Sequence, residues 1–273
     1  MRKALAWLRV PALVFALALP TAGLAAAPEP PDPWPDLKRD VFNDRPIQED
    51  TGVVALEMPY RAEDGAFVPT TLRLNVPPAD SRSIKTVTLV IDQNPAPVAA
   101  TFTLAPGVTM ITTKVRVDSY SNVRAVAELS DGTLHMAKIF VKASGGCSAP
   151  AAGNLEAARA NLGRMQLKQV ARGEAAAASR PREAEIAIRH PNNSGLQMDQ
   201  VTRHYTPAFF VRELNLWQGD EPVLKVDAGI SLSEDPTIRF VYRPNGATSI
   251  RAEAVDTDGN RFSGAWKVEA EGM

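Results

Sequence analysis

The feature that most constrains the fold is a long succession of short apolar segments separated by turn residues. Met110–Val117 illustrates it, because its apolar and β-branched residues recur at every second position, as in a half-buried strand. Glu63-Asp64-Gly65 and Ser130-Asp131-Gly132 are turn signals between such segments. This pattern predicts an antiparallel β-sandwich in the first half of the chain. The strands expected there are Gly52–Met58, Val68–Val76, Ile84–Ile91, Val98–Leu104, Met110–Val117, Asn122–Leu129 and Leu134–Val141.

The second half repeats the alternation. Gln218-Gly219-Asp220 and Asp258-Gly259-Asn260 are hairpin turns with glycine where a positive φ is needed. The sequence therefore predicts an all-β protein, with two immunoglobulin-like antiparallel β-sandwich domains joined by a linker with one short helix. The strands expected in the second domain are Ala184–Arg189, Phe209–Trp217, Pro222–Asp227, Thr237–Tyr242, Thr248–Asp256 and Phe262–Glu269.

The residues between the two predicted sandwiches differ in composition. Lys142–Gly153 consists mainly of small residues, so we expect a mobile arm that buries little. Asn154 is a good helix N-cap, and apolar residues at helical spacing follow it to about Gly173. The predicted organisation is a first sandwich over 50–147 that ends in a Gly-Gly-Cys arm, a linker with the helix over 148–182, and a second sandwich over 183–273.

Residues 1–27 have the layout of a secretory signal peptide. Basic residues begin the chain, Val10–Leu19 is apolar, and small residues precede Pro28. The apolar run is only half of the roughly 20 residues that cross a bilayer, so a cleaved leader is favoured over an uncleaved anchor. We therefore expect export to the periplasm, and no later segment is expected to span a membrane. A proline-rich lead-in over 28–49 should contain a short helix through Leu37–Phe42, capped by Asp36.

Charge and cysteine content exclude several classes of protein. The 30 basic and 31 acidic residues leave no positive excess to neutralise phosphates, so we expect no nucleic-acid partner. The single cysteine, Cys147, rules out an internal disulfide framework and any multi-cysteine metal site. The sequence contains only three histidines. We predict no metal and no cofactor.

Cys147 is the main candidate functional residue. An unpaired thiol in an exported protein is an intermolecular partner, a reactive group or an incidental exposed residue. Gly145 and Gly146 precede it, and residues without side chains allow a backbone to enter a narrow cleft of another protein. A catalytic role would need a base such as His135, but His135 lies in phase with the apolar residues of its strand. Self-contained enzyme activity is therefore disfavoured.

The other candidate sites are weaker. His190 and His204 have no carboxylate at ligand spacing, so strand and loop ends are favoured over a metal site for them. Asn192-Asn193-Ser194 matches a glycosylation acceptor, which is a short and weak motif. Asp256, Asp258 and Asn260 could belong to a calcium loop, but a plain hairpin is favoured because the downstream glutamate is missing.

Two sets of motifs follow one another along the chain. The first half contains Met58–Pro69, Asp92–Pro95, Ser130–Gly132 and Val141–Cys147, and the second contains His190-Pro191, Gly195-Leu196, Phe209–Leu214 and Gly229–Pro236. The first set resembles SoxY and the second resembles SoxZ, the two subunits of the Sox sulfur-carrier complex, here fused in one chain. The arrangement is particularly similar to fused SoxYZ-like carriers associated with quinoprotein (PQQ) dehydrogenases.

The resemblance implies a mechanism and partners. Cys147 would carry sulfur intermediates covalently, as in thiosulfate oxidation, and Gly145 and Gly146 would form the slender carrier arm. Periplasmic c-type cytochromes, sulfur-oxidation enzymes or a quinoprotein dehydrogenase would be the partners. This chain departs from the family arm, since Ser148-Ala149-Pro150 follow the cysteine and tether it. The alternative is an accessory or binding module for a periplasmic quinoprotein alcohol dehydrogenase and its cytochrome c.

Overall fold

A computed structural model describes residues 32–76, 80–150, 160–170, 180–199 and 202–268 of the chain. The chain divides into Met1–Asp32 and one compact unit, Pro33–Met273. The predicted signal peptide and the start of the helix predicted from Asn154 lie outside the described residues. Within the described residues, no helix is long and apolar enough to cross a membrane.

The first half forms a helix and eight strands, and its hairpins are the predicted ones. The turn at Ser130–Gly132 joins two paired antiparallel strands, and the Glu63–Gly65 turn lies between two others. The elements are α1 (Trp34–Phe42), β1 (Ile47–Glu49), β2 (Val54–Glu57), β3 (Val68–Leu74), β4 (Ile84–Ile91), β5 (Val98–Leu104), β6 (Met110–Val115), β7 (Ser121–Leu129) and β8 (Leu134–Val141).

The second half contains the six predicted strands and one more. Its hairpins at Gln218–Asp220 and Asp258–Asn260 are again the predicted ones. The strands are β9 (Met165–Val170), β10 (Arg182–Ile188), β11 (Val211–Gln218), β12 (Glu221–Ala228), β13 (Thr237–Tyr242), β14 (Ser249–Asp256) and β15 (Arg261–Lys267).

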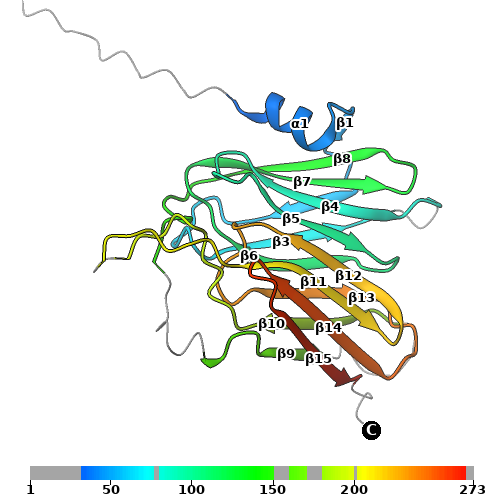
Figure 1. The fold of residues 1–273 in the computed structure, drawn as a ribbon. Coiled ribbons are helices and arrows are strands. Elements are labelled where there is room, and N and C mark those ends of the chain that lie inside the picture. Colours follow the sequence, from blue (N-terminus) through cyan, green and yellow to red (C-terminus); the bar gives the residue numbers. More distant parts are fainter. Residues whose placement is uncertain (1–31, 77–79, 151–159, 171–179, 200–201, 269–273) are drawn as a thin grey trace, which may run out of the picture. The chain divides into compact units, whose positions relative to one another are not determined.

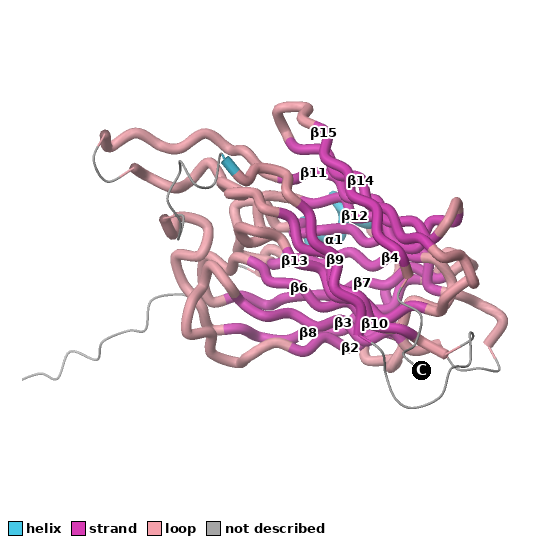
Figure 2. Tube along the Cα trace, turned by 90° about the horizontal axis from the view of Figure 1, so that it is seen from below, coloured by secondary structure: helices cyan, strands magenta, loops and turns pink. Residues whose placement is uncertain are grey.

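The protein is all-β, with two sandwiches whose sheets continue from one half into the other (Figures 1 and 2). One sheet has nine strands in the order β1-β8-β7-β4-β5-β12-β11-β14-β15, and the other has six in the order β2-β3-β6-β13-β10-β9. The halves meet where β5 pairs with β12 and β6 pairs with β13, both antiparallel. Each sheet therefore crosses the junction with backbone hydrogen bonds.

Alternating burial explains why the two sheets pack face to face. On β14, Ile250, Ala252, Ala254 and Asp256 are buried, whereas the residues between them are more exposed. The buried residues of both halves form one hydrophobic cluster that includes Phe102 of the first half. One core therefore serves both sandwiches, and removing apolar area of this kind from water is the main stabilising term.

Three local predictions need correction. The helix predicted to extend to about Gly173 is wrong over β9, which pairs with β10 at the edge of the six-stranded sheet. The sheets are not wholly antiparallel, because β1 pairs with β8 in parallel. The helix predicted over Leu37–Phe42 begins earlier, at Trp34, with Pro33 at the N-cap, so Asp36 lies in the first turn and does not cap it.

Candidate functional site

The segment after β8 is docked against the protein. We predicted a mobile arm over Lys142–Gly153, and this is wrong for the part that the structure describes, up to Pro150. The Cys147 residue has 0% of its surface exposed, although the sequence suggested an accessible thiol. The predicted site residues Gly145, Gly146 and Cys147 lie together in this docked segment.

Glycine at 146 allows the segment to approach the backbone of two other loops. A Cβ atom added at Gly146 would lie 2.1 Å from the carbonyl oxygen of Gly65 and 2.6 Å from that of Val117. Gly145 has a φ of +68°, but a Cβ there would meet only the Ser148 hydroxyl oxygen, at 3.9 Å. The two glycines therefore differ in role. Gly146 permits close packing, and Gly145 permits the turn.

The first half of the chain holds the segment by backbone hydrogen bonds. The amides of Gly145 and Gly146 donate to the carbonyl oxygens of Asp118 (2.7 Å) and Val117 (3.2 Å). The Cys147 amide donates to Oδ1 of Asp118 at 3.1 Å. These bonds fix the backbone on both sides of the thiol.

The second half closes over the same segment. The Ser194 hydroxyl donates to the Cys147 carbonyl oxygen. Nε2 of Gln197 donates to the carbonyl oxygen of Ala149 at 3.0 Å. Cys147 therefore lies at the junction of the two halves, and hydrogen bonds to both halves must break before its segment can leave this position.

Arg116 is a buried charged residue beside the segment. Its side chain lies at the junction, with 1% of the residue exposed. Nη1 donates to the carbonyl oxygen of Gly146 at 3.1 Å, and Nη2 donates to that of Asn192 at 3.4 Å. Nε has no hydrogen-bond partner. The guanidinium thus contacts the residue that directly precedes Cys147.

Asn94 supports this arrangement from behind. Its side-chain amide donates to the Arg116 carbonyl oxygen at 2.7 Å and to the Ser231 hydroxyl oxygen at 2.9 Å. Its carbonyl oxygen accepts from the amide of Asp118 at 2.9 Å. Through these bonds, Asn94 connects Arg116 and Asp118 of the first half with Ser231 of the second half.

Burial controls the acidity of the thiol. Loss of solvent raises the pKa of Cys147 from 9.0 to about 12, and the negative charge of Asp118 adds to the rise. The positive charge of Arg116 acts in the opposite direction but does not outweigh these effects. Because the thiolate is the reactive form, the docked segment holds a protonated and unreactive thiol at neutral pH.

The histidines are not placed to activate the thiol. His135 lies on β8, where Nδ1 is 2.9 Å from the Thr51 hydroxyl and Nε2 is 3.2 Å from that of Thr133. Val141, at the end of β8, is six positions further along the strand, which corresponds to about 20 Å. His190 is buried beside Asp256, with Nε2 and Oδ2 3.6 Å apart, and burial lowers its pKa. His204 is exposed in a loop.

The two remaining motifs have structural roles. The Asp256 carboxylate accepts hydrogen bonds from the amides of Asp258 and Asn260, as expected for the favoured hairpin. The residue Asn192 of the glycosylation motif has no exposed surface. Its side chain accepts a hydrogen bond from the amide of Val211, so it is not accessible for modification in this fold. Among the described residues, no group of three or more His, Cys, Asp or Glu side chains could hold a metal ion.

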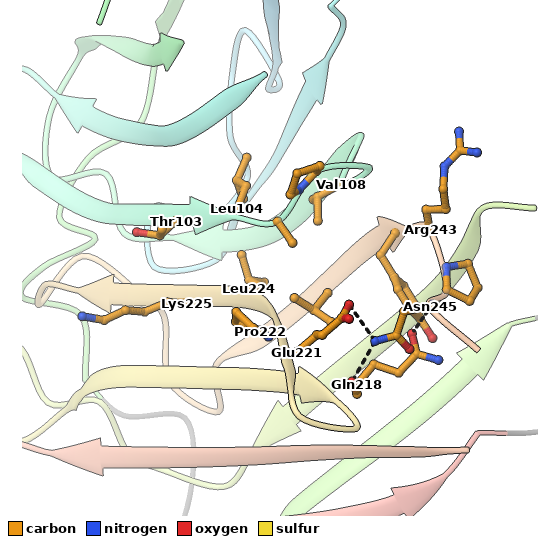
Figure 3. A pocket seen from close by; sticks show the side chains of 15 residues that line it. Thr103, Leu104, Val108, Gln218, Glu221, Pro222, Leu224, Lys225, Arg243 and Asn245 are labelled. Atoms are coloured by element: carbon orange, nitrogen blue, oxygen red, sulfur yellow. Dashed lines mark hydrogen bonds between the residues drawn. The ribbon is translucent and has the colours of Figure 1, made fainter. Parts of the chain in front are cut away.

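A cavity of about 610 Å³ has Val108, just before β6, in its lining (Figure 3). The cysteine segment lies beyond the other end of β6, where the Gly146 amide bonds the Val117 carbonyl oxygen. Strands β5, β12 and β13 contribute to the cavity, so it also lies at the junction of the halves. The Asn245 amide donates to the Glu221 carboxylate and to the Gln218 carbonyl oxygen, both at 3.0 Å. Much of its polar lining is therefore bonded internally, and neither cysteine nor histidine lines it.

Sequence reasoning did not identify the residues that bury the thiol. The alternation of Met110–Val117 places Arg116 on the polar, outward face of its strand, where an exposed arginine is expected. It is buried instead because the Gly146 and Asn192 loops cover it. Asp118, Ser194 and Gln197 have no local signal that would distinguish them from ordinary loop residues. The motifs Asp92–Pro95 and Asn192–Ser194 contain Asn94 and Ser194 of this site, but neither motif indicates that a thiol is buried beside it.

Fold and site together define a class of protein: a fused pair of β-sandwiches with one thiol at their junction. Two family models match the chain in succession, "Sulfur oxidation protein SoxY" over residues 38–147 and "Sulphur oxidation protein SoxZ" over residues 170–267. The chain therefore contains a SoxY domain followed by a SoxZ domain and is a fused SoxYZ-like protein. These domains support a role as a carrier in sulfur oxidation and imply partner enzymes of that process.

Two solved structures are similar to parts of this chain. The sulfur carrier protein SoxY from Chlorobium limicola f thiosulfatophilum is 27% identical, with a TM-score of 0.35, over 40% of this chain and 90% of that one. A superoxide reductase (neelaredoxin) from Ignicoccus hospitalis is 13% identical, with a TM-score of 0.32, over 36% of this chain and 95% of that one. The chain has no match among curated protein sequences.

Proposed function

We propose that this protein carries sulfur intermediates covalently on Cys147 and delivers them to the enzymes that oxidise them. The observation that carries the proposal is the position of Cys147. The SoxY match ends at this residue, which is the only cysteine of the chain and follows Gly145 and Gly146. A carrier needs one thiol that partner enzymes can reach, and no second thiol is present to form an intramolecular disulfide.

The chemistry is thiol–disulfide type exchange at sulfur. The Cys147 thiolate attacks one sulfur of an S–S bond, a new S–S bond forms to Cys147, and the other sulfur leaves with the electron pair of the broken bond. The docked segment is unreactive because its thiol is buried and protonated. Loading and delivery therefore require the segment to leave its place between the two halves.

The carrier acts with partners and does not turn over substrate by itself. Among the described residues, the groups whose charges act on the Cys147 thiol are Asp118 and Arg116, and no histidine base is one of them. Periplasmic c-type cytochromes and sulfur-oxidation enzymes are the proposed partners, and a quinoprotein dehydrogenase is a further proposed one. The leader-like sequence over residues 1–27 supports export to the periplasm as the compartment.

Intact mass spectrometry of the protein from its native compartment, before any reductant is added, tests the proposal. We expect a fraction of molecules heavier by a sulfur-containing group, and loss of that mass on reduction. Cys147→Ser should give only the unmodified mass. A clean thiol in every preparation, with a dehydrogenase that copurifies equally with wild type and Cys147→Ser, would favour the accessory-module alternative.

A further inference from the structure

One loop of the second half holds both the cysteine segment and a buried histidine. We call this loop, residues 190–197, the closing loop. Its residues Ser194 and Gln197 donate to the carbonyl oxygens of Cys147 and Ala149. His190 begins the loop and has 1% of its surface exposed. A titratable side chain is therefore built into the loop that covers the thiol.

The closing loop depends on the neutral form of His190. Nδ1 of its ring accepts a hydrogen bond from the backbone amide of Asn192 at 3.1 Å, so this nitrogen carries no proton. The proton of the neutral ring is on Nε2, which faces Oδ2 of Asp256 at 3.6 Å and has no hydrogen-bond partner in the described part of the chain. A second proton can only go to Nδ1, where it meets the N–H group of Asn192. Protonation of the ring therefore breaks the bond to Asn192.

Asn192 connects the histidine to the cysteine segment. Its carbonyl oxygen accepts from Nη2 of Arg116, whose Nη1 donates to the carbonyl oxygen of Gly146. Asn192 also has a φ of +41°, a left-handed conformation that a residue with a side chain keeps only where its surroundings hold it. The bond to His190 is one of these supports, and it lies two residues before Ser194. A change at His190 thus acts on the contacts that hold the cysteine segment in place.

The charges around the ring oppose one another. The Asp256 carboxylate, which accepts from the amides of Asp258 and Asn260, favours a protonated ring. Burial disfavours it more strongly, so the pKa of His190 lies below the ordinary value of 6.5. Further charged side chains around the ring and its partners are Asp235 before β13, Arg189, which pairs with Asp235, Arg212 on β11 and Arg116 after β6.

We propose that protonation of His190 releases the cysteine segment, so that mild acid increases access to the Cys147 thiol. This inference goes beyond the carrier function, because it concerns access to the thiol and not the group that the thiol carries. The contribution of the neutral ring to docking is complete above about pH 6.5 and is lost as the pH falls below that value. The undocked segment leaves the ring free to take up a proton at Nδ1.

Access is measured with 4,4′-dithiodipyridine, a disulfide that reacts with thiols even in mild acid. The Cys147 thiolate attacks one sulfur, forms a mixed disulfide and releases pyridine-4-thione, whose absorbance gives the rate. The rate is measured on the full-length protein, folded and in urea, from about pH 8 to about pH 5. The ratio of the rate in urea to the rate in the folded protein is the protection by the fold, and it cancels the pH dependence of the reaction itself. Tryptophan fluorescence at each pH reports whether the protein remains folded.

In the wild type we expect constant protection from about pH 8 to 7 and a fall below about pH 6.5, which approaches tenfold for each pH unit, the limit for one proton. The fluorescence should remain that of the folded protein. His190→Gln keeps an acceptor for the Asn192 amide but cannot gain a proton, so its protection should not change with pH. His204→Gln, in an exposed loop, is the matched control and should keep the wild-type dependence.

Constant protection in the wild type over the whole range overturns the proposal without any variant. A fall that His190→Gln shares overturns it as well, because another group then titrates. A fall that coincides with loss of the native fluorescence also contradicts it, since the whole protein then unfolds. These outcomes are independent of the carrier function, because the reagent reports access whether or not Cys147 carries a sulfur group.

Discussion

At the scale of the residue, Cys147 couples stability to pH. Its pKa is about 12 in the docked state and 9.0 when solvated, so the folded state favours the protonated thiol. The stability from this shift is complete below about pH 9 and is lost as the pH rises toward 12, at about 1.4 kcal/mol per unit. Relative to Cys147→Ser, the wild type should lose about 2 kcal/mol more between pH 7.5 and 10.5. Urea denaturation with reductant present measures the free energy of unfolding at each pH. Equal losses in the wild type and in Cys147→Ser would mean that the thiol is solvated in solution.

A second residue-scale prediction concerns the ion pair between Arg124 and Asp92. Both side chains are almost fully buried, and Nε of Arg124 lies 3.0 and 2.9 Å from the two carboxylate oxygens. Asp92→Asn removes the counter-charge and leaves a buried arginine, so it should lower the free energy of unfolding by about 3–5 kcal/mol. Glu57→Gln is the matched control. It breaks the exposed pair with Arg73 and should cost less than about 1 kcal/mol. Similar losses for both would contradict the burial of the first pair.

At the scale of the element, the docked segment gives a test of the two glycines. Gly146→Ala places a methyl group against the backbone of Gly65 and Val117, so the segment cannot dock as it does here. The Cys147 thiol should then react with iodoacetamide at least tenfold faster than in the wild type. Gly145→Ala introduces a strained positive φ without a close contact, so it should cost about 1 kcal/mol and raise the rate much less. Equal rates for the two variants would show that docking does not depend on close packing at Gly146.

The strands and turns also show which features of the fold can be predicted from local sequence and which cannot. The hairpins at Ser130–Gly132 and Asp258–Asn260 were predictable because the turn residues and the alternating strands lie next to each other in sequence. β9 was not, since the helical spacing that predicted a helix lies upstream and reaches only its first residue, Met165, whereas its identity as a strand comes from pairing with β10. Burial of Cys147 was missed for the same reason. It depends on residues far along the chain, from Gly65 to Ser194, that no local pattern connects.

At the scale of the whole molecule, the continuous sheets make one unit of the two domains. β5 pairs with β12 through Leu104–Ala100, and β6 pairs with β13 through Met110–Thr112. Buried residues of both halves share one core. The second half also supplies Ser194 and Gln197 to the docked cysteine segment. The arrangement therefore makes the state of the thiol depend on contact between the two domains, and physical separation of the domains would remove that control.

A cut between the domains tests this dependence. A protease site inserted within residues 151–159 divides the chain between the cysteine segment and the second half. Because the paired strands and the common core remain, the two fragments should elute together in size-exclusion chromatography, and the iodoacetamide reactivity of Cys147 should stay close to that of the uncut protein. Uncut protein with the same insertion is the control. In about 4 M urea the fragments should separate and reactivity should rise at the same denaturant concentration. Separate elution of the fragments without denaturant would contradict a common core. If the fragments separate in urea and the reactivity of Cys147 does not rise, the second half does not cover the thiol.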